Sequence, residues 1–96
     1  MSLAIKFTPE AEDTYNSLVS QLRQRWGEQF VTKFERKISK ALDTIISSPY
    51  IYPLAYENTE IRKCLIHKNC SMFYKIYDST ILIVWFWDNR QEPLFT

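Results

Sequence analysis

Glycine occurs once in this chain, at Gly27, and its four prolines stand at positions 9, 49, 53 and 93. Because glycine and proline interrupt regular structure most strongly, so few of them leave long segments whose hydrophobic pattern is easy to read. Between residues 9 and 48 apolar residues recur every three or four positions, which is typical of helices. Beyond residue 60 the pattern becomes that of strands. This order predicts an α+β fold.

The first half of the chain predicts a short strand and two helices. Residues 3 to 7 have the pattern of a strand, and Thr8 followed by Pro9 is a typical helix start. The first helix is expected to bury Ala11, Tyr15, Leu18, Leu22 and Trp26. Gly27 ends or bends it, and the second helix is expected to bury Phe30, Phe34, Ile38, Ala41 and Ile45 before Pro49 stops it. A connection this short predicts an antiparallel helical hairpin.

The second half predicts three strands, at residues 60–68, 70–77 and 80–88, after an irregular connector at 49–59. Lys68-Asn69 and Asp78-Ser79 separate the strands as two-residue turns. The whole reads as β-α-α-β-β-β, a helical hairpin packed on a small, mainly antiparallel sheet. At 96 residues the chain is long enough for one domain, spanning 1–96.

The predicted sheet is apolar on both faces. The register that these turns imply groups Leu65, Met72, Tyr74, Ile83 and Trp85 on one face, and Cys64, Ile66, Phe73, Val84 and Phe86 on the other. One helical hairpin covers only one face, so a partner is expected on the second, at Phe73, Val84 and Phe86. Two alternatives stay open: a turn misregistered by one residue, or a connector folded over that face.

Charge is nearly balanced overall but not locally. Twelve Lys and Arg against eleven Asp and Glu give a net charge of +1, which argues against a nucleic-acid binder driven by bulk charge. Residues 23–40 nevertheless hold six basic side chains against two acidic ones, a local net of +4. Such a stretch is either a solvated helix face or a docking surface for an acidic protein or nucleic acid.

A second basic group consists of Arg62, Lys63, Lys75 and Arg90. In the predicted register Arg62 and Lys75 are cross-strand neighbours on one face, which suits a phosphate or another anion. The alternative is that these cations form surface salt bridges with Asp88 or with the nearby glutamates.

No arrangement typical of a cofactor or metal enzyme is present. Cys64, Cys70 and His67 show neither zinc-ligand spacing nor a nucleophile and base pattern, and glycine-rich phosphate loops are absent. We therefore expect no metal and no cofactor. The chain also lacks an apolar run long enough to span a membrane and lacks a signal-peptide pattern, so we expect a cytoplasmic protein with no membrane partner.

Taken together, these segments resemble the RelE/ParE superfamily of toxins over nearly the whole chain. The pieces that carry the likeness are residues 8–11 (TPEA), 48–49 (SP), 60–63 (EIRK), 72–78 (MFYKIYD), 81–86 (ILIVWF) and 88–90 (DNR). Each is degenerate alone, and their order and spacing make the resemblance moderately specific.

The resemblance implies the toxin of a type II toxin–antitoxin pair, a class that includes plasmid stabilisation proteins, held inactive by a cognate antitoxin. RelE-like members cleave ribosome-bound mRNA with basic residues and a C-terminal tyrosine or histidine, whereas ParE-like members block DNA gyrase and are not nucleases. Arg62 and Arg90 match arginines of the family and would be catalytic only in a ribonuclease. Arg62, Lys63, Lys75 and Arg90 are the expected contacts to the target or to phosphate.

Departures from the ribonuclease pattern favour the ParE-like type. Phe95 stands where ribonuclease members place a tyrosine or histidine, and a phenyl ring cannot exchange a proton. Tyr56, Glu57 and Asn58 occupy the stretch where lysines are expected. We therefore expect a toxin that binds gyrase, with ribosome-dependent mRNA cleavage and a non-toxic interaction module as alternatives. Both a homodimer and a toxin–antitoxin hetero-oligomer remain open.

Overall fold

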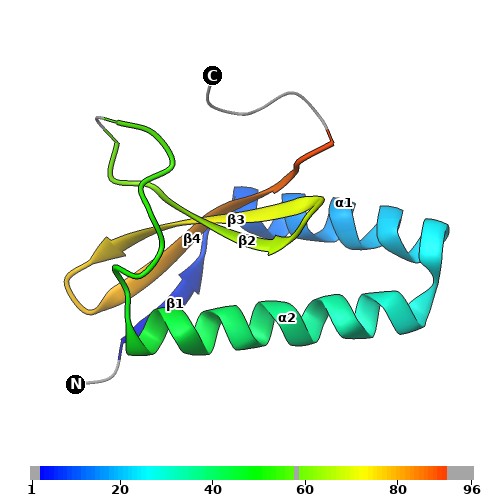
Figure 1. The fold of residues 1–96 in the computed structure, drawn as a ribbon, viewed down its shortest axis with the longest axis horizontal. Helices are drawn as coiled ribbons and strands as arrows, with labels where there is room; N and C mark the ends of the chain where they lie inside the picture. The colour runs from blue at the N-terminus through cyan, green and yellow to red at the C-terminus, as the bar shows by residue number, and fades with distance from the viewer. Residues whose placement is uncertain (1–2, 58, 91–96) are drawn as a thin grey trace.

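In the computed structural model, which describes residues 3–57 and 59–90, the chain forms four strands and two helices. The strands are β1 (Ala4–Phe7), β2 (Arg62–His67), β3 (Cys70–Tyr77) and β4 (Thr80–Asp88), and the helices are α1 (Pro9–Trp26) and α2 (Glu28–Ser47). They follow one another as β1-α1-α2-β2-β3-β4 (Figure 1). The predicted order and the α+β class are confirmed.

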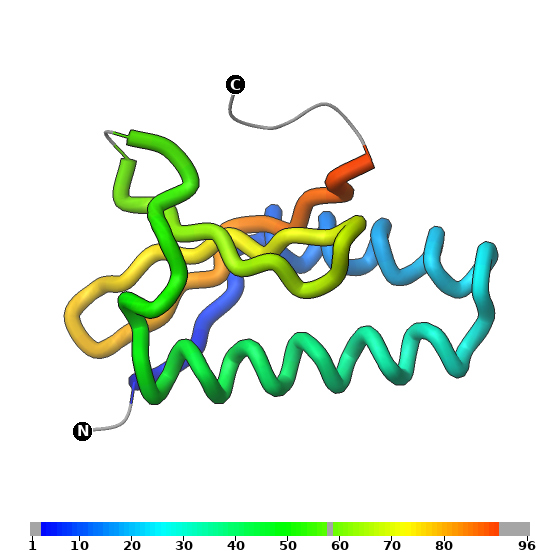
Figure 2. Tube along the Cα trace, in the orientation of Figure 1, coloured from blue at the N-terminus to red at the C-terminus, as the bar shows by residue number. Residues whose placement is uncertain are grey.

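The four strands form one sheet in the order β1-β4-β3-β2. β2, β3 and β4 are an antiparallel meander, whereas β1 pairs in parallel with β4, so the first strand lies beside the last one (Figures 1 and 2). The helical hairpin covers one face of this sheet. α1 packs against β4, and α2 packs against β2.

The start of α1 is fastened to β4 by two threonine hydroxyls. Thr8 caps the helix, because its Oγ1 accepts a hydrogen bond from the backbone N–H of Ala11 at 3.0 Å, and it donates one to the carbonyl of Val84 at 2.7 Å. One turn later, Thr14 Oγ1 accepts a hydrogen bond from the N–H of Phe86 at 2.9 Å. β1 ends at Phe7, so these hydroxyls pair backbone groups of β4 that β1 no longer reaches.

Gly27 alone connects the two helices. Its φ of +83° lies in the left-handed region that glycine adopts without strain, and its N–H donates to the carbonyl of Arg23 at 2.9 Å. The chain therefore reverses direction in one residue, as the sequence predicts. Trp26 is a correction to the predicted core: it is the last residue of α1 and is 46% exposed.

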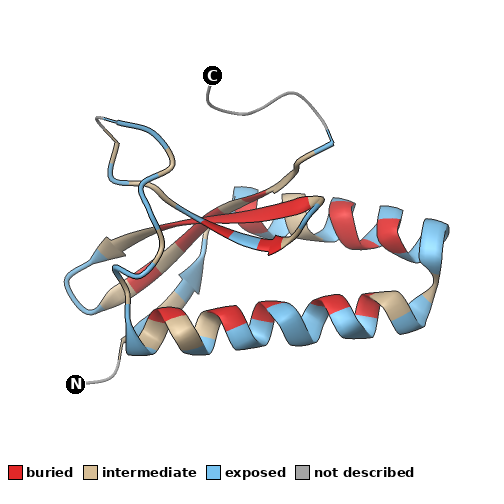
Figure 3. Cartoon of the chain, viewed as in Figure 1, coloured by how far each residue is buried: buried red, intermediate tan, exposed pale blue. Residues whose placement is uncertain are grey.

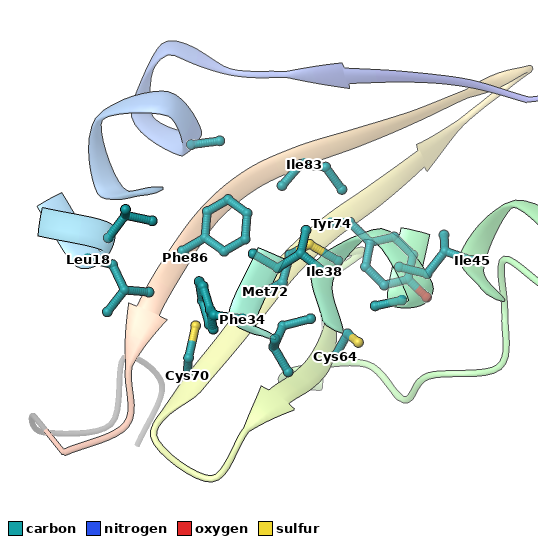
Figure 4. Close-up of a cluster of buried hydrophobic side chains, with 14 of the residues drawn as sticks. Leu18, Phe34, Ile38, Ile45, Cys64, Cys70, Met72, Tyr74, Ile83 and Phe86 are labelled. Carbon is teal, nitrogen blue, oxygen red and sulfur yellow. The ribbon is translucent and has the colours of Figure 1, made fainter. Parts of the chain in front are cut away.

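The core lies between the hairpin and the inner face of the sheet (Figures 3 and 4). The buried residues of α2 are Val31, Phe34, Ile38, Ala41 and Ile45, close to the predicted stripe. They meet Cys64, Met72, Tyr74, Ile81, Ile83 and Phe86 of the sheet. Each fully buried large apolar side chain of this kind contributes about 1.5–3 kcal/mol to folding.

A β-bulge in β4 differs from the predicted register. Ile83 pairs with Tyr74 and Trp85 pairs with Phe73, so Val84 is an extra residue without a partner on β3. An extra residue turns every following side chain to the other face of the sheet. The carbonyl of Val84, the bulged residue, accepts the hydrogen bond from the Thr8 hydroxyl.

A second bulge lies in β2. His67 pairs with Cys70, as the predicted turn requires, but Leu65 pairs with Ser71, which leaves Ile66 as the extra residue. The remainder of β2 is therefore shifted by one position relative to the predicted register.

The two predicted faces are consequently wrong for several residues. Cys64, Ile66 and Phe86, predicted on the partner-binding face, are buried in the core under the helices. Leu65 and Trp85, predicted beside Met72 and Tyr74, lie on the outer face of the sheet. The physical reason is the one-residue shift at each bulge.

The connector between α2 and β2 is tied along the free edge of β2. Leu54 forms an isolated antiparallel bridge with Arg62, and the N–H of Lys63 donates to the carbonyl of Pro53 at 3.1 Å. The buried Tyr74 hydroxyl donates to the carbonyl of Pro49 at 2.7 Å. These contacts fix the path of the connector beside the sheet.

We expect Thr8→Ala to lower the free energy of unfolding by about 1–2 kcal/mol, because it removes the helix cap and leaves the Val84 carbonyl without its donor. Urea denaturation measures this change. Thr8→Ser keeps the hydroxyl and should retain most of the stability. Equal losses in both variants would contradict the role of the hydroxyl.

Candidate functional site

Arg62 stands at the start of β2 and is turned toward the connector. Its Nη1 donates to the carbonyl of Tyr52 at 2.6 Å, and its guanidinium carbon lies 4.9 Å from the centre of the Tyr50 ring. Leu54 and Thr59 line an open hollow of about 290 Å³ beside it. This predicted contact residue therefore anchors the connector with part of its guanidinium group.

Lys63 and Lys75 lie on the outer face of the sheet. Lys63 pairs with Phe73, and Lys75 is two residues further along β3, so both side chains share the face of Phe73. Arg62 pairs with Tyr74 and belongs to the opposite face. The predicted convergence of Arg62 and Lys75 on one face is therefore wrong, and the bulge at Ile66 is its cause.

Arg90 follows the end of β4 and is paired with a carboxylate. Its Nη2 lies 2.6 Å from Oδ2 of Asp88, and its Nε lies 2.9 Å from Oδ1. The predicted alternative of a salt bridge with Asp88 is thus observed for Arg90. This pair holds the pKa of Asp88 below its usual range, chiefly through the side-chain hydrogen bond, with Arg25 as a weaker cause.

The two arginines lie at different levels of the sheet. Arg62 is level with Tyr74 of β3, whereas Arg90 lies beyond Asp88, which is level with Cys70. Four residues of strand separate these levels, which is about 13 Å at 3.3 Å per residue. Their guanidinium groups are also held by separate partners, the Tyr52 carbonyl and the Asp88 carboxylate, so in this structure the two arginines do not converge on one phosphate site.

Phe73 and Val84, two of the predicted partner contacts, are on the outer part of the sheet and are 2% and 6% exposed. Phe73 packs on Trp85 with ring centres 5.6 Å apart. The third, Phe86, lies under the helices, with its ring 5.3 Å from that of Tyr15. The structure thus separates residues that the sequence placed together.

An apolar groove between the helices is a feature that the sequence did not reveal. Its volume is about 400 Å³, and it is lined by Phe7, Ala11, Glu12, Tyr15, Asn16, Ile38 and Phe86. We call it the inter-helix groove. The lining comes from β1, α1, α2 and β4, and only the fold brings these elements together. The one available signal is Phe7, a large apolar residue that ends β1 and stays 44% exposed.

Polar groups at this groove and in the core retain their protons at neutral pH. Tyr15 donates to Oε2 of Glu35 at 3.3 Å, and burial, with Glu35 as a further cause, raises its pKa. Burial also raises the pKa of Tyr74 to about 12 and that of Cys70 to about 12. These residues are therefore poor general bases or nucleophiles.

The remaining candidates for chemistry have structural surroundings. Cys64 and Cys70 are buried, free thiols, and burial raises the pKa of Cys64 as well. Burial lowers the pKa of His67, and Lys37 and Lys68 add to this effect. Within residues 3–57 and 59–90 no group of His, Cys, Asp and Glu side chains could hold a metal ion. Phe95 lies outside the described residues.

Neither helix in the described part of the chain has the length and apolar character needed to cross a membrane.

A family model for the ParE toxin of the type II toxin–antitoxin system parDE matches residues 5–93. No curated protein sequence matches the chain. Several solved structures are similar in fold despite low identity. The chromosomal ParDE system of P. aeruginosa shares 12% identity, with a TM-score of 0.73 and coverage of 90% of this chain and 95% of that one.

The YoeB/ParE toxin from Agrobacterium tumefaciens shares 14% identity, with a TM-score of 0.65 and coverage of 90% and 98%. The DinJ–YafQ toxin–antitoxin complex of E. coli shares 11%, with a TM-score of 0.61 and coverage of 94% and 96%.

We expect Asp88→Asn to flatten the acid side of the stability curve. The depressed pKa of Asp88 means that its ion pair stabilises the fold above the carboxyl's unfolded-state pKa and is lost as pH falls through the folded-state pKa. Thermal unfolding between about pH 7 and pH 2 should therefore show a smaller loss of stability in the variant, which is already less stable at neutral pH.

The control for this prediction is Asp43→Asn, an exposed position of α2 with no ion pair to another described residue. The plot of stability against pH for this control variant should run parallel to that of the unchanged protein. A parallel curve for Asp88→Asn would contradict the assigned role of the ion pair.

Proposed function

Because the chain belongs to the ParE toxin family of type II toxin–antitoxin systems, we propose that it arrests growth by binding a bacterial target and that a cognate antitoxin neutralises it. DNA gyrase is the candidate target that the family suggests. The observation that supports binding over mRNA cleavage is the placement of the two arginines. Arg62 is tied to the connector and Arg90 to Asp88, about 13 Å or more apart along the sheet.

A ribonuclease needs its cations and its proton donor around one scissile phosphate. Tyr74, the tyrosine closest to Arg62 in the ladder, keeps its proton because its pKa is about 12 and its hydroxyl is bonded to the carbonyl of Pro49. Binding through the outer face needs only exposed cations and apolar surface. The exposed Lys63, the half-buried Lys75 and the 60%-exposed Leu65 supply these.

We propose that the antitoxin places an apolar segment in the inter-helix groove. Phe86, expected as an antitoxin contact, lines this groove with Phe7 and Tyr15. A groove of about 400 Å³ accommodates one or two large apolar side chains. All three predicted contacts are nearly covered, and Phe86 is the one that lines this groove. Structures of other toxins of this fold with their antitoxins, such as DinJ–YafQ, support a protein partner of this kind.

We expect the charge-reversed double variant Lys63→Glu/Lys75→Glu to raise the toxin concentration needed to inhibit gyrase supercoiling by about tenfold, equivalent to about 1.4 kcal/mol of binding energy. The matched control, Lys33→Glu/Lys40→Glu, reverses two cations on the exposed face of α2 and should inhibit like the unchanged protein. If the purified toxin cleaves mRNA on translating ribosomes and leaves gyrase unaffected, the ribonuclease alternative is correct. Unimpaired growth on induction would favour the non-toxic module.

For the antitoxin site we expect Phe7→Ala to weaken binding of the co-expressed antitoxin by about tenfold, because it removes one wall of the groove. Isothermal titration of the purified pair measures the affinity. Leu65→Ala truncates an exposed apolar residue on the outer face of the sheet, and this variant should bind the antitoxin as before. Weaker antitoxin binding by Leu65→Ala together with unchanged binding by Phe7→Ala would contradict the groove and place the antitoxin on the outer face.

A further inference from the structure

The turn end of the helical hairpin carries a half-exposed tryptophan held between cations. Trp26 packs on Phe30 with ring centres 5.0 Å apart, and the guanidinium carbons of Arg25 and Arg90 lie 5.5 and 5.8 Å from the centre of its ring. We call Arg25, Trp26 and Arg90, with Asp88, the arginine–tryptophan cluster. Trp26 is the last residue of α1, and in Figure 1 the turn between α1 and α2 lies at the opposite end of the molecule from the connector.

Both guanidinium groups are oriented before any ligand arrives. Stacking on the indole restricts each of them, and Asp88 also accepts hydrogen bonds from Nε and Nη2 of Arg90. Within residues 3–57 and 59–90, no carboxylate is within ion-pair distance of Arg25. Less side-chain entropy is lost when an oriented donor binds an anion, so this placement favours binding.

Beside the two arginines lies an open hollow of about 420 Å³, lined by Gln21, Gln24, Arg25 and Arg90. Glutamine amides both donate and accept hydrogen bonds, which suits a peptide backbone as well as side chains. The walls therefore present two cations and two amides to one space, and both cations pack on Trp26.

We infer that the arginine–tryptophan cluster docks an acidic peptide segment of a partner protein, with a Glu or Asp carboxylate against Arg25 and Arg90. Two arginines against one aspartate leave a local charge of +1, which matches one carboxylate better than a run of phosphates. The ring of Trp26 is already packed on Phe30 and flanked by the guanidinium groups, which leaves little of its face for a stacked base. Trp and Arg are also the residues most enriched at the centres of protein interfaces.

This inference goes beyond the proposed function, because it holds whichever target the toxin has. It is tested by binding alone, with the purified full chain. The probe is a fluorescein-labelled 12-residue peptide of alternating Glu and Ala, compared with its Gln and Ala counterpart and with single-stranded oligouridylate of 12 nucleotides. Fluorescence anisotropy at low and at physiological salt gives the affinities.

We expect the acidic peptide to bind and the Gln peptide to bind at least tenfold more weakly. Added salt should lower the affinity for the acidic peptide. Arg25→Gln and Arg90→Gln should each lower the affinity for the acidic peptide about fivefold or more. Arg36→Gln replaces an exposed arginine of α2 and should change this affinity less than twofold. Circular dichroism confirms that each variant is folded. No binding, an equal loss in Arg36→Gln, or tighter binding of the oligonucleotide would overturn the inference.

Discussion

The contact on which the rest of this fold depends is the pair of hydroxyl bonds between α1 and β4. β1 covers only the first part of β4, and Thr8 and Thr14 satisfy the backbone groups that follow, at Val84 and Phe86. A buried backbone group without a partner costs about 1–3 kcal/mol, so these bonds determine where α1 sits on the sheet. Gly27 then returns the chain at once, and the position of α2 follows from that of α1.

The bulge at Val84 lies at this contact and decides what each face of the sheet displays. Before it, the alternation of β4 points Ile81 and Ile83 toward the helices, and after it Phe86 continues that face in place of Trp85. The bulge thus brings Phe86 into the inter-helix groove beside Tyr15 and sends Trp85 outward onto Phe73. This one extra residue therefore decides that Phe86 lines the inner groove and that Trp85 lies on the outer face with Lys63 and Lys75.

Hydrophobic period and sparse breakers were enough to predict the elements and their order, because apolar spacing and proline act locally. They also predicted the helical hairpin, since Gly27 leaves no room for another connection. The bulges at Ile66 and Val84 were not predictable, because a bulge depends on partners in other strands and on α1. Arg62 and Arg90 were recognisable as candidates from residue type and position. Their actual partners, a carbonyl of the connector and Asp88, depend on the bulges and on the path of the connector.

The parallel pairing of β1 with β4 sets the order in which the fold can be completed. Thr8 and Val84, which share a hydrogen bond, are 76 residues apart in a chain of 96. During synthesis β1 emerges before the other elements of this sheet and has no sheet partner until β4 leaves the ribosome. The inter-helix groove and the arginine–tryptophan cluster both include residues from the end of β4 or just beyond it. Neither surface exists before β4 and Arg90 have been made, so a growing polypeptide offers no finished binding surface until that segment has emerged.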